Sequence, residues 1–449
     1  MPVMDKVLVY APLNRVLALV DGDVFAQLRE ACATAAAAGS APLSPLVDAL
    51  RRPGTLPGVR RVGVVAEPAF LGIIPTRGCN MGCRYCDFAA PKRDSPVMPL
   101  ATAKRAVDAY LELVCRSGTG AGHIQFFGGE PFYAAEVVRF VVDYAREAAR
   151  RLDLQLHIEA TSNGLYSEAT CEWIAHHLDA LVLSLDGPPD ILDRHRPGLN
   201  GHSVAGVLLR NARILSGGPV ELAIRACVTA DTVHRLPEIA EWFVAEFRPK
   251  TVCFESLRSG PQASSEGLAP PDPFEFATEF IAAERVLSAA GIGAVFSTAE
   301  IDQIQTSFCP VGRDGLIVSP DGAIDACYLL EKDWLEAGLD LRLGRLTADG
   351  FDLSVDAVER VRELSVERKM LCRDCFCRFH CAGGCHVHHR TDAPAGSFDR
   401  LCIQTRIVTL HRLLVKAGEP ELADTWLDAR DAVERSVQQE NDRFREVGG

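Results

Sequence analysis

The stretch FLGIIPTRGCNMGCRYC, residues 70–86, determines how the rest of the chain is interpreted. Its first half is a short apolar run, which predicts a buried strand. Its second half places Cys79, Cys83 and Cys86 in one glycine-containing loop directly after that strand. Three thiolates on a tight loop can hold three corners of a four-iron, four-sulfur cluster, which normally takes four cysteine ligands. The sequence therefore predicts a cluster with one iron open to another ligand.

A zinc site is the alternative for these three cysteines. Zinc loops favour pairs of cysteines, and this triplet has no fourth ligand near it in the sequence, so an iron–sulfur cluster is favoured. An open iron can bind the amino nitrogen and carboxylate of S-adenosylmethionine. An electron from the cluster can then cleave the sulfonium and release a 5′-deoxyadenosyl radical.

The segment from residue 70 to about residue 258 alternates between apolar strand patterns and helical periodicity. The candidate strands are FLGIIPT (70–76), HIQFFGG (123–129), LQLHIEATS (154–162), ALVLSLD (180–186), ELAIRACVT (221–229) and TVCFESL (251–257). Six β–α units in series predict an α/β fold with a parallel sheet and external helices, either an open sheet or a partial barrel. Reactive groups in such folds lie at the C-terminal ends of strands, where Cys79, Gly128–Glu130, Asn163–Gly164 and Ser184–Gly187 occur.

The triplet spacing, with Tyr85 before the third cysteine, resembles the signature of the radical S-adenosylmethionine (SAM) superfamily. Three later segments agree with it: GGEP at 128–131, TSNG at 161–164 and SLDGP at 184–188. The resemblance covers about residues 70–260 and implies a partial (β/α)6 TIM-like barrel. It implies cofactor contacts from Tyr85, Gly128, Gly129, Glu130, Asn163, Ser184, Asp186 and Arg196. For Ser184, Asp186 and Arg196 an ordinary turn or cap is the alternative.

A second group of cysteines resembles the seven-cysteine pattern of SPASM domains, which carry two auxiliary four-iron clusters. The family's interleaved ligation implies that Cys309, Cys327 and Cys385 hold auxiliary cluster I. It implies that auxiliary cluster II is held by Cys372, Cys375, Cys381 and Cys402. Zinc is again the alternative, but an odd set of seven disfavours it.

Several residues near this pattern have no assigned role. Cys377 is an extra cysteine, interpreted as a free thiol or a ligand. His386, His388 and His389 are interpreted as surface residues or as supports of the ligands, with a ligand role for one of them as the alternative. Auxiliary cluster I lacks a fourth cysteine, because residues 300–308 contain none and Cys253 lies in the sixth predicted strand. We therefore expect an open iron there, or one held by another group.

One branch of the SPASM enzymes, the sulfatase-maturing enzymes, places an aspartate base directly after the cysteine that corresponds to Cys327. Here that residue is Tyr328, which disfavours oxidation of a sulfatase residue. The sequence does not identify a replacement base; the candidates are Asp314, Asp325, Tyr328 and the histidines.

The length, charge and apolar content of the chain disfavour certain classes of binding partner. The chain has 449 residues and a formal charge of −13, which disfavours binding to nucleic acid or to an anionic membrane. No apolar run reaches the roughly 18 residues that span a bilayer, and the N-terminus lacks the pattern of a signal peptide. The sequence thus predicts a cytoplasmic protein. We interpret the five scattered cysteines of the 16 as small buried hydrophobic residues.

The predicted organisation has five parts: a small unit (1–58), the radical SAM partial barrel (66–258), a connecting segment with a helix (259–305), the SPASM domain (306–402) and C-terminal helices (403–449). The first part reads as a hairpin and a helix, either a leader-peptide-binding unit or a lid on the barrel.

The resemblance implies an oxidoreductase of peptide maturation. Such an enzyme modifies, and most often crosslinks, a ribosomally made precursor peptide, and takes electrons from a flavodoxin- or ferredoxin-type reductant. Three alternatives remain: a SPASM enzyme that oxidises or epimerises a small molecule such as an aminoglycoside, a non-enzymatic iron–sulfur electron carrier, and a zinc-scaffolded binding protein.

Overall fold

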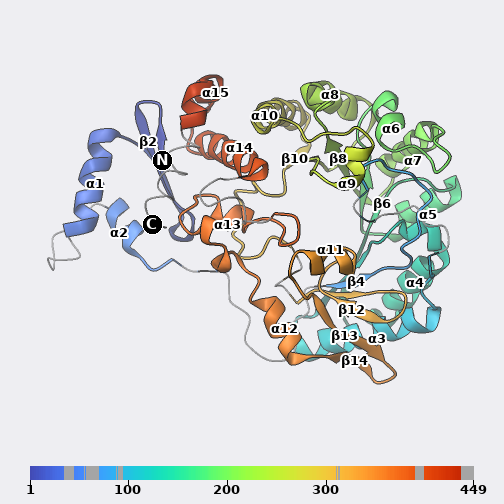
Figure 1. Cartoon of the computed structure of the whole chain (residues 1–449). Helices are drawn as coiled ribbons and strands as arrows, with labels where there is room; N and C mark the ends of the chain where they lie inside the picture. The colour runs from blue at the N-terminus through green and yellow to red at the C-terminus, as the bar shows by residue number, and fades with distance from the viewer. Residues whose placement is uncertain are drawn as a thin grey trace.

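The computed structural model describes residues 1–34, 45–54, 56, 70–86, 88, 95–309, 311, 314–389 and 399–435. Its centre is a sheet in the order β10-β9-β8-β7-β6-β5-β4-β11-β12-β13-β14. Every pair from β10 to β11 is parallel, and the remaining pairs from β11 to β14 are antiparallel. Figure 1 shows the parallel part and the antiparallel extension as one continuous body.

The parallel strands are β4 (Leu71–Ile73), β5 (Ala121–Phe126), β6 (Gln155–Ser162), β7 (Ala180–Ser184), β8 (Glu221–Val228), β9 (Thr251–Ser256) and β10 (Gly293–Val295). The helices between and after them are α3 (Leu100–Ser117), α4 (Ala135–Arg151), α5 (Glu168–His177), α6 (Pro189–His195), α7 (Ala205–Gly217), α8 (Leu236–Glu246), α9 (Pro261–Ser265) and α10 (Pro273–Ala289). The predicted α/β class and the six strand–helix units are confirmed.

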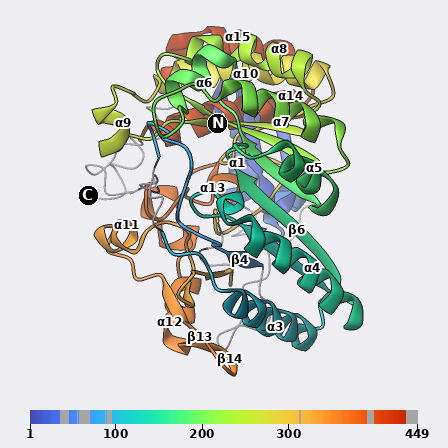
Figure 2. The ribbon, with the colours of Figure 1, turned by 90° about the vertical axis from the view of Figure 1, so that its right-hand side faces the viewer.

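The alternation of side chains between the two faces of the sheet explains which face the helices cover. In β5 and β6 the side chains of Ile124, Phe126, Ile158 and Ala160 are buried in the hydrophobic core. The long apolar stripes of α3 and α4 pack on that face, as Figure 2 shows beside β6. The intervening residues therefore point to the opposite face of the sheet, which is the face available to a site.

The cysteine-rich region continues the sheet, which the sequence did not predict. Its elements are β11 (Leu316–Val318), β12 (Ala323–Asp325), α11 (Glu331–Glu336), β13 (Arg342–Thr347), β14 (Gly350–Leu353), α12 (Val355–Arg362) and α13 (Arg378–Cys381). β11 lies beside β4 in parallel register, with Ile317 paired with Gly72. The strand before the cysteine triplet therefore also supports the second cysteine-rich region.

The N-terminal unit is a three-stranded antiparallel sheet of β1 (Pro2–Val3), β2 (Lys6–Ala11) and β3 (Val16–Asp21), followed by α1 (Gly22–Thr34) and α2 (Pro45–Arg51). This confirms the predicted hairpin. Part of the predicted linker at 51–58 lies outside the described residues. Tyr10 on β2 hydrogen-bonds through its hydroxyl to Nε2 of His380 on α13, so the unit contacts the cysteine-rich region (Figure 1).

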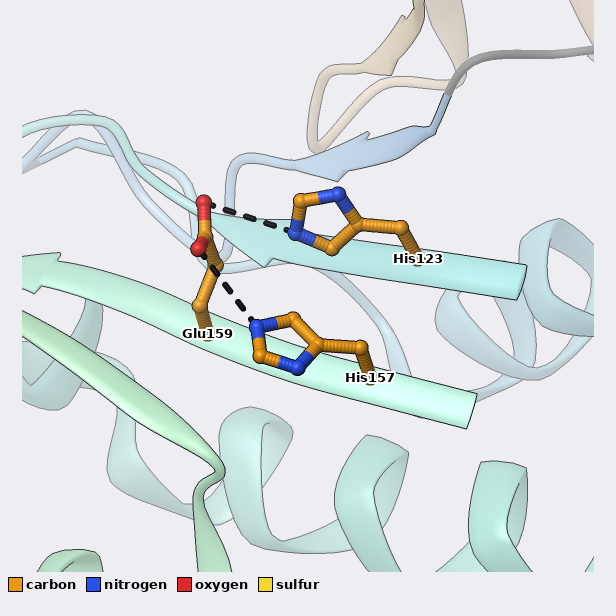
Figure 3. A group of neighbouring side chains, drawn as sticks. All are labelled: His123, His157 and Glu159. Atoms are coloured by element: carbon orange, nitrogen blue, oxygen red, sulfur yellow. Dashed lines mark ion pairs between the residues drawn. The ribbon is translucent and has the colours of Figure 1, made fainter. Parts of the chain in front are cut away.

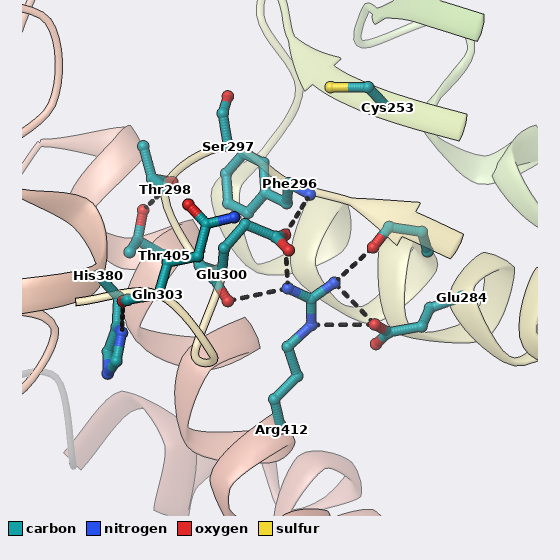
Figure 4. Close-up of polar contacts among 12 residues, drawn as sticks. Cys253, Glu284, Phe296, Ser297, Thr298, Glu300, Gln303, His380, Thr405 and Arg412 are labelled. Carbon is teal, nitrogen blue, oxygen red and sulfur yellow. Dashed lines mark hydrogen bonds and ion pairs between the residues drawn. The ribbon is translucent and has the colours of Figure 1, made fainter. Parts of the chain in front are cut away.

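The C-terminal helices α14 (Arg400–Lys416) and α15 (Pro420–Asp428) pack against the parallel part through α10. Arg412 on α14 is 11% exposed and contacts Glu284 on α10 and Glu300 after β10, at 2.7 and 2.9 Å (Figure 4). It also donates to the backbone carbonyls of Ala294 and Ala299. One guanidinium thus joins three segments that are distant in sequence.

We expect Arg412→Ala to destabilise the folded protein by about 3 kcal/mol, because two partly buried carboxylates and two carbonyls lose their donor. Thermal unfolding of the reconstituted full chain under anaerobic conditions measures the change. Arg213→Ala is the matched control. Its exposed pair with Glu246 is expected to contribute no more than about 1 kcal/mol. Equal melting temperatures for the two variants would show that the Arg412 contacts do not hold α14 in place.

Candidate functional site

The cysteine triplet lies in the loop after β4, at the C-terminal ends of the parallel strands. Burial, together with nearby Glu130, Cys83 and Cys86, raises the pKa of the Cys79 thiol to about 12. Burial likewise raises the pKa of Cys83 to about 11, although Arg196 opposes the shift. Three thiols that perturb one another in a desolvated loop form a soft donor set, which fits an iron–sulfur cluster.

Two glycines let the loop after β5 pack directly against the cysteine loop. A Cβ on Gly129 would lie 2.2 Å from the carbonyl oxygen of Gly78, and Gly128 has a φ of +139°. The amide of Glu130 also donates to the Gly78 carbonyl at 2.9 Å. The GGEP segment therefore fixes the backbone next to Cys79.

Glu130 is 1% exposed and links the ends of β5 and β6. Its Oε1 accepts from the Phe132 amide and the Ser162 hydroxyl, and its Oε2 accepts from the Asn163 amide at 2.7 Å. Burial raises its pKa to about 7 although these hydrogen bonds oppose the shift. A carboxylate has about four acceptor positions, so these three donors leave room for one more, such as a ligand ammonium.

Asn163 connects this network to the cluster loop. Its side-chain amide donates to Asn80 Oδ1 at 2.9 Å and to Cys79 Sγ at 3.5 Å. Its Oδ1 accepts from the Leu165 amide, which fixes the orientation of the side chain. Hydrogen bonds to cysteine sulfur are one of the ways a protein tunes a cluster.

A second polar network joins the cysteine loop to β7. Tyr85 donates to Asp186 Oδ2 at 2.7 Å and accepts from Arg196 at 2.6 Å. Asp186 also lies 3.3 Å from Nδ1 of His195. Burial alone would raise the pKa of Asp186, but His195, Arg196 and Tyr85 together lower it. The structure therefore brings together three of the predicted cofactor contacts, while Ser184 lies half-buried at the end of β7.

His195, which no sequence pattern marked as functional, is fully buried on α6. Its Nε2 lies 3.5 Å from the Thr229 hydroxyl after β8, so it connects Asp186 to the next strand. Its position directly before Arg196, a predicted cofactor contact, was the one signal in the sequence that pointed to it. A buried histidine in a polar cluster cannot otherwise be distinguished from an exposed one on a short helix.

The seven cysteines of the second pattern fall into two groups. Burial raises the pKa of Cys327 to about 12, with further contributions from Cys309 and Cys385. Burial also raises the pKa of Cys402, with further contributions from Asp399 and then from Cys381, Cys375 and Cys372. The cysteines with the largest effects on Cys327 and on Cys402 are the ones that the resemblance places with each of them.

Cys377 lies with the second of these sets. It is 1% exposed and interacts with Cys375, while its thiol is 4.0 Å from the Thr405 carbonyl. Lys369 interacts with cysteines of both sets, Cys372 and Cys381 on one side and Cys385 and Cys309 on the other. Its Nζ donates to the backbone carbonyls of Gly383 and Gly384.

The three histidines of this region occupy different environments. His389 is buried, with Nδ1 2.5 Å from Asp399 Oδ2 and Nε2 3.5 Å from Cys402 Sγ. Burial lowers the pKa of His386 to about 4, and His388 is exposed. His389 is thus the one oriented to support a cysteine ligand, because a carboxylate fixes its other ring nitrogen.

The candidate bases are held in contrasting ways. Tyr328 is packed near Phe70 and Phe127, and burial raises its pKa well above the usual range, so its phenol stays protonated. Asp314 forms a bidentate pair with Arg362 at 2.8 Å. Asp325 is half-buried, and burial raises its pKa to about 6.

Comparison with known proteins identifies the first part of this arrangement. Residues 73–213 match the radical SAM superfamily. This segment is a radical SAM domain. The protein is therefore an enzyme whose cofactors are SAM and a four-iron, four-sulfur cluster. The triplet loop places three cysteine thiols where they could hold such a cluster.

Similar proteins extend beyond that domain. The serine-type anaerobic sulfatase-maturating enzyme of Klebsiella aerogenes is 25% identical over 344 residues, covering 72% of this chain and 80% of the relative. The structure of native anSMEcpe with bound AdoMet is 18% identical with a TM-score of 0.58, and covers 80% of this chain and 99% of that one. Streptococcus suis SuiB bound to precursor peptide SuiA is 15% identical with a TM-score of 0.50, and covers 72% of each chain.

The helices of the structure bear on whether the chain crosses a membrane. In the described part of the chain, no helix combines the length and the apolar character needed to cross a bilayer.

Proposed function

We propose that this radical SAM enzyme oxidatively modifies a ribosomally made precursor peptide and that the modification is a crosslink. The observation that carries the proposal is the division of seven cysteines into two groups in the region that continues the sheet from β4. Three of them, Cys309, Cys327 and Cys385, would hold auxiliary cluster I. The other four, Cys372, Cys375, Cys381 and Cys402, would hold auxiliary cluster II.

When bound, SAM and the cluster would supply a 5′-deoxyadenosyl radical for hydrogen abstraction from the substrate, and the auxiliary clusters would accept the surplus electron. The protein's own residues position the reactants. Glu130 offers its remaining acceptor position to the ammonium of SAM, and Tyr85, held by Asp186 and Arg196, stands beside the third cysteine. Tyr328 packs near the rings of Phe70 and Phe127, beside β4.

Auxiliary cluster I would be incompletely ligated by cysteine. Cys377, the extra cysteine, interacts with Cys375 of the other set, and Cys253 lies within β9 beside Glu255. An open position there could bind a substrate thiolate and hold the group to be crosslinked. It could equally serve only to accept an electron.

The N-terminal unit supports a peptide substrate. Among the described residues β3 pairs only with β2, so it presents an edge to which an extended segment can add as a further strand. Two similar proteins also have peptide or protein substrates. SuiB is bound to a precursor peptide, and the Klebsiella enzyme matures a sulfatase. Tyr328, which replaces the aspartate expected of a sulfatase-maturing enzyme and stays protonated, disfavours that particular reaction.

Hydrogen–deuterium exchange on the full chain tests this proposal. A candidate precursor peptide, made with its leader from any short reading frame found next to the gene, is expected to protect the β3 amides, Val16–Asp21, because each new strand hydrogen bond slows exchange. The same peptide is expected to increase 5′-deoxyadenosine formation and to lose two mass units per new bond. An aminoglycoside is the comparison substrate.

The outcomes separate the alternatives. Turnover of the aminoglycoside, with no change in any peptide, would assign a small-molecule substrate. Peptide turnover without protection of β3 would leave residues 1–58 as a lid on the rest of the enzyme. Electron transfer through the iron–sulfur clusters without SAM cleavage would show that the protein is a non-enzymatic electron carrier instead.

A further inference from the structure

A cluster of metal-binding side chains lies outside the machinery described above. His123 on β5 and His157 on β6 are directly paired in the parallel register, and Glu159 follows His157 by two residues. All three point to the face opposite the buried Ile124 and Ile158, so they meet on one surface (Figure 3). One ligand atom from each lies within 4.8 Å of the others.

The contact distances suit ligands that share a metal ion, and they also lie within the range of ion pairs. Nε2 of His123 lies 3.4 Å from Glu159 Oε1, and Nε2 of His157 lies 3.7 Å from Oε2. Nε2 of His123 is buried yet has no hydrogen-bond partner among the described residues, although it faces the carboxylate. Ligands about 2.0–2.1 Å from a tetrahedral zinc lie roughly 3.4 Å apart, close to the 3.4 and 3.7 Å between each imidazole and the carboxylate here.

The carboxylate is held in place by neighbours outside the cluster. Gln125 donates its side-chain amide to Glu159 Oε1, and its own oxygen accepts from the Tyr328 hydroxyl at 2.9 Å. Gly72 makes room for that hydroxyl, because a Cβ there would lie 2.4 Å from it. Such outer hydrogen bonds orient the ligands of metal sites.

We propose that His123, His157 and Glu159 form a divalent-cation site of the zinc type, with water in the fourth position. Two imidazoles and one carboxylate suit Zn²⁺, and His157, with a side chain 49% exposed, leaves the ion accessible from solvent. The site is separate from the radical centre. His123 precedes Gly128 by five residues, which is about 16 Å along an extended strand.

Zinc titration of the full-length, anaerobically reconstituted enzyme tests this site. Iron and sulfide are quantified first, so that zinc in place of iron at the cysteines is detected, and Zn²⁺ is then titrated against a chromophoric chelator. The wild-type enzyme is expected to bind one equivalent. His157→Ala and Glu159→Gln are expected to weaken binding by at least about 100-fold, and Gln125→Ala by about 10- to 100-fold.

The matched control is His177→Ala, which removes an exposed histidine on α5 whose Nδ1 contacts the Trp173 carbonyl. It should bind zinc as the wild type does, and SAM cleavage without zinc should be equal in all variants. Zinc X-ray absorption should show nitrogen and oxygen neighbours only. Equal zinc binding by wild type and His157→Ala, no binding by either, or sulfur around the zinc would each overturn the proposal.

Discussion

Replacing Cys79, Cys83 and Cys86 together with alanine is expected to abolish the reductive cleavage of SAM to 5′-deoxyadenosine and methionine. The three thiols are the donor set of the loop after β4, and without them the cluster that delivers the electron has no site. Chromatographic measurement of 5′-deoxyadenosine after reduction with dithionite gives the activity. Each single replacement is expected to have the same effect, because two thiolates do not retain the cluster. Normal cleavage by the triple variant would contradict the assignment of the radical centre.

Cys115→Ala is the control for a general effect of cysteine loss, because Cys115 is exposed on α3 and not buried as the sequence predicted. Iron analysis adds a second readout. The triple variant should lose about four iron atoms per chain and keep the iron held by the other cysteines, because those cysteines lie on different segments. Loss of all iron would show instead that the triplet is needed for folding of the whole molecule.

The parallel strands from β5 to β9 could be predicted because each carries a local signal. They have five to eight residues and alternate with helices, several of them long and amphipathic. The parallel strand β10 and the strands β11 and β12 of the extension could not be predicted, since they have three residues each. Such short strands are defined by their pairing partners and not by their own periodicity.

The candidate site was predictable where the residues follow strand ends. Glu130, Asn163 and Asp186 lie near one another because the carboxyl ends of parallel strands share one edge of the sheet. The division of the later cysteines into two sets came from family resemblance, because spacing alone does not determine which thiols meet. His123, His157 and Glu159 went unnoticed because their proximity depends on the register between β5 and β6, which no single strand encodes.

Gly129→Ala is expected to reduce SAM cleavage by roughly 100-fold or more, although it adds only one methyl group. The new Cβ would lie 2.2 Å from the Gly78 carbonyl and 2.5 Å from that of Arg77, and both are backbone atoms that cannot rotate away. The cysteine loop must therefore move, and a misplacement of about 1 Å in a catalytic arrangement costs about that factor. Iron content and 5′-deoxyadenosine yield measure the effect. Gly217→Ala is the matched control, because no atom lies within 4 Å of its added Cβ and α7 is helical there. If both variants behave like the wild type, the contact between the GGEP segment and the cysteine loop does not fix the cluster, and the role assigned to the two glycines fails.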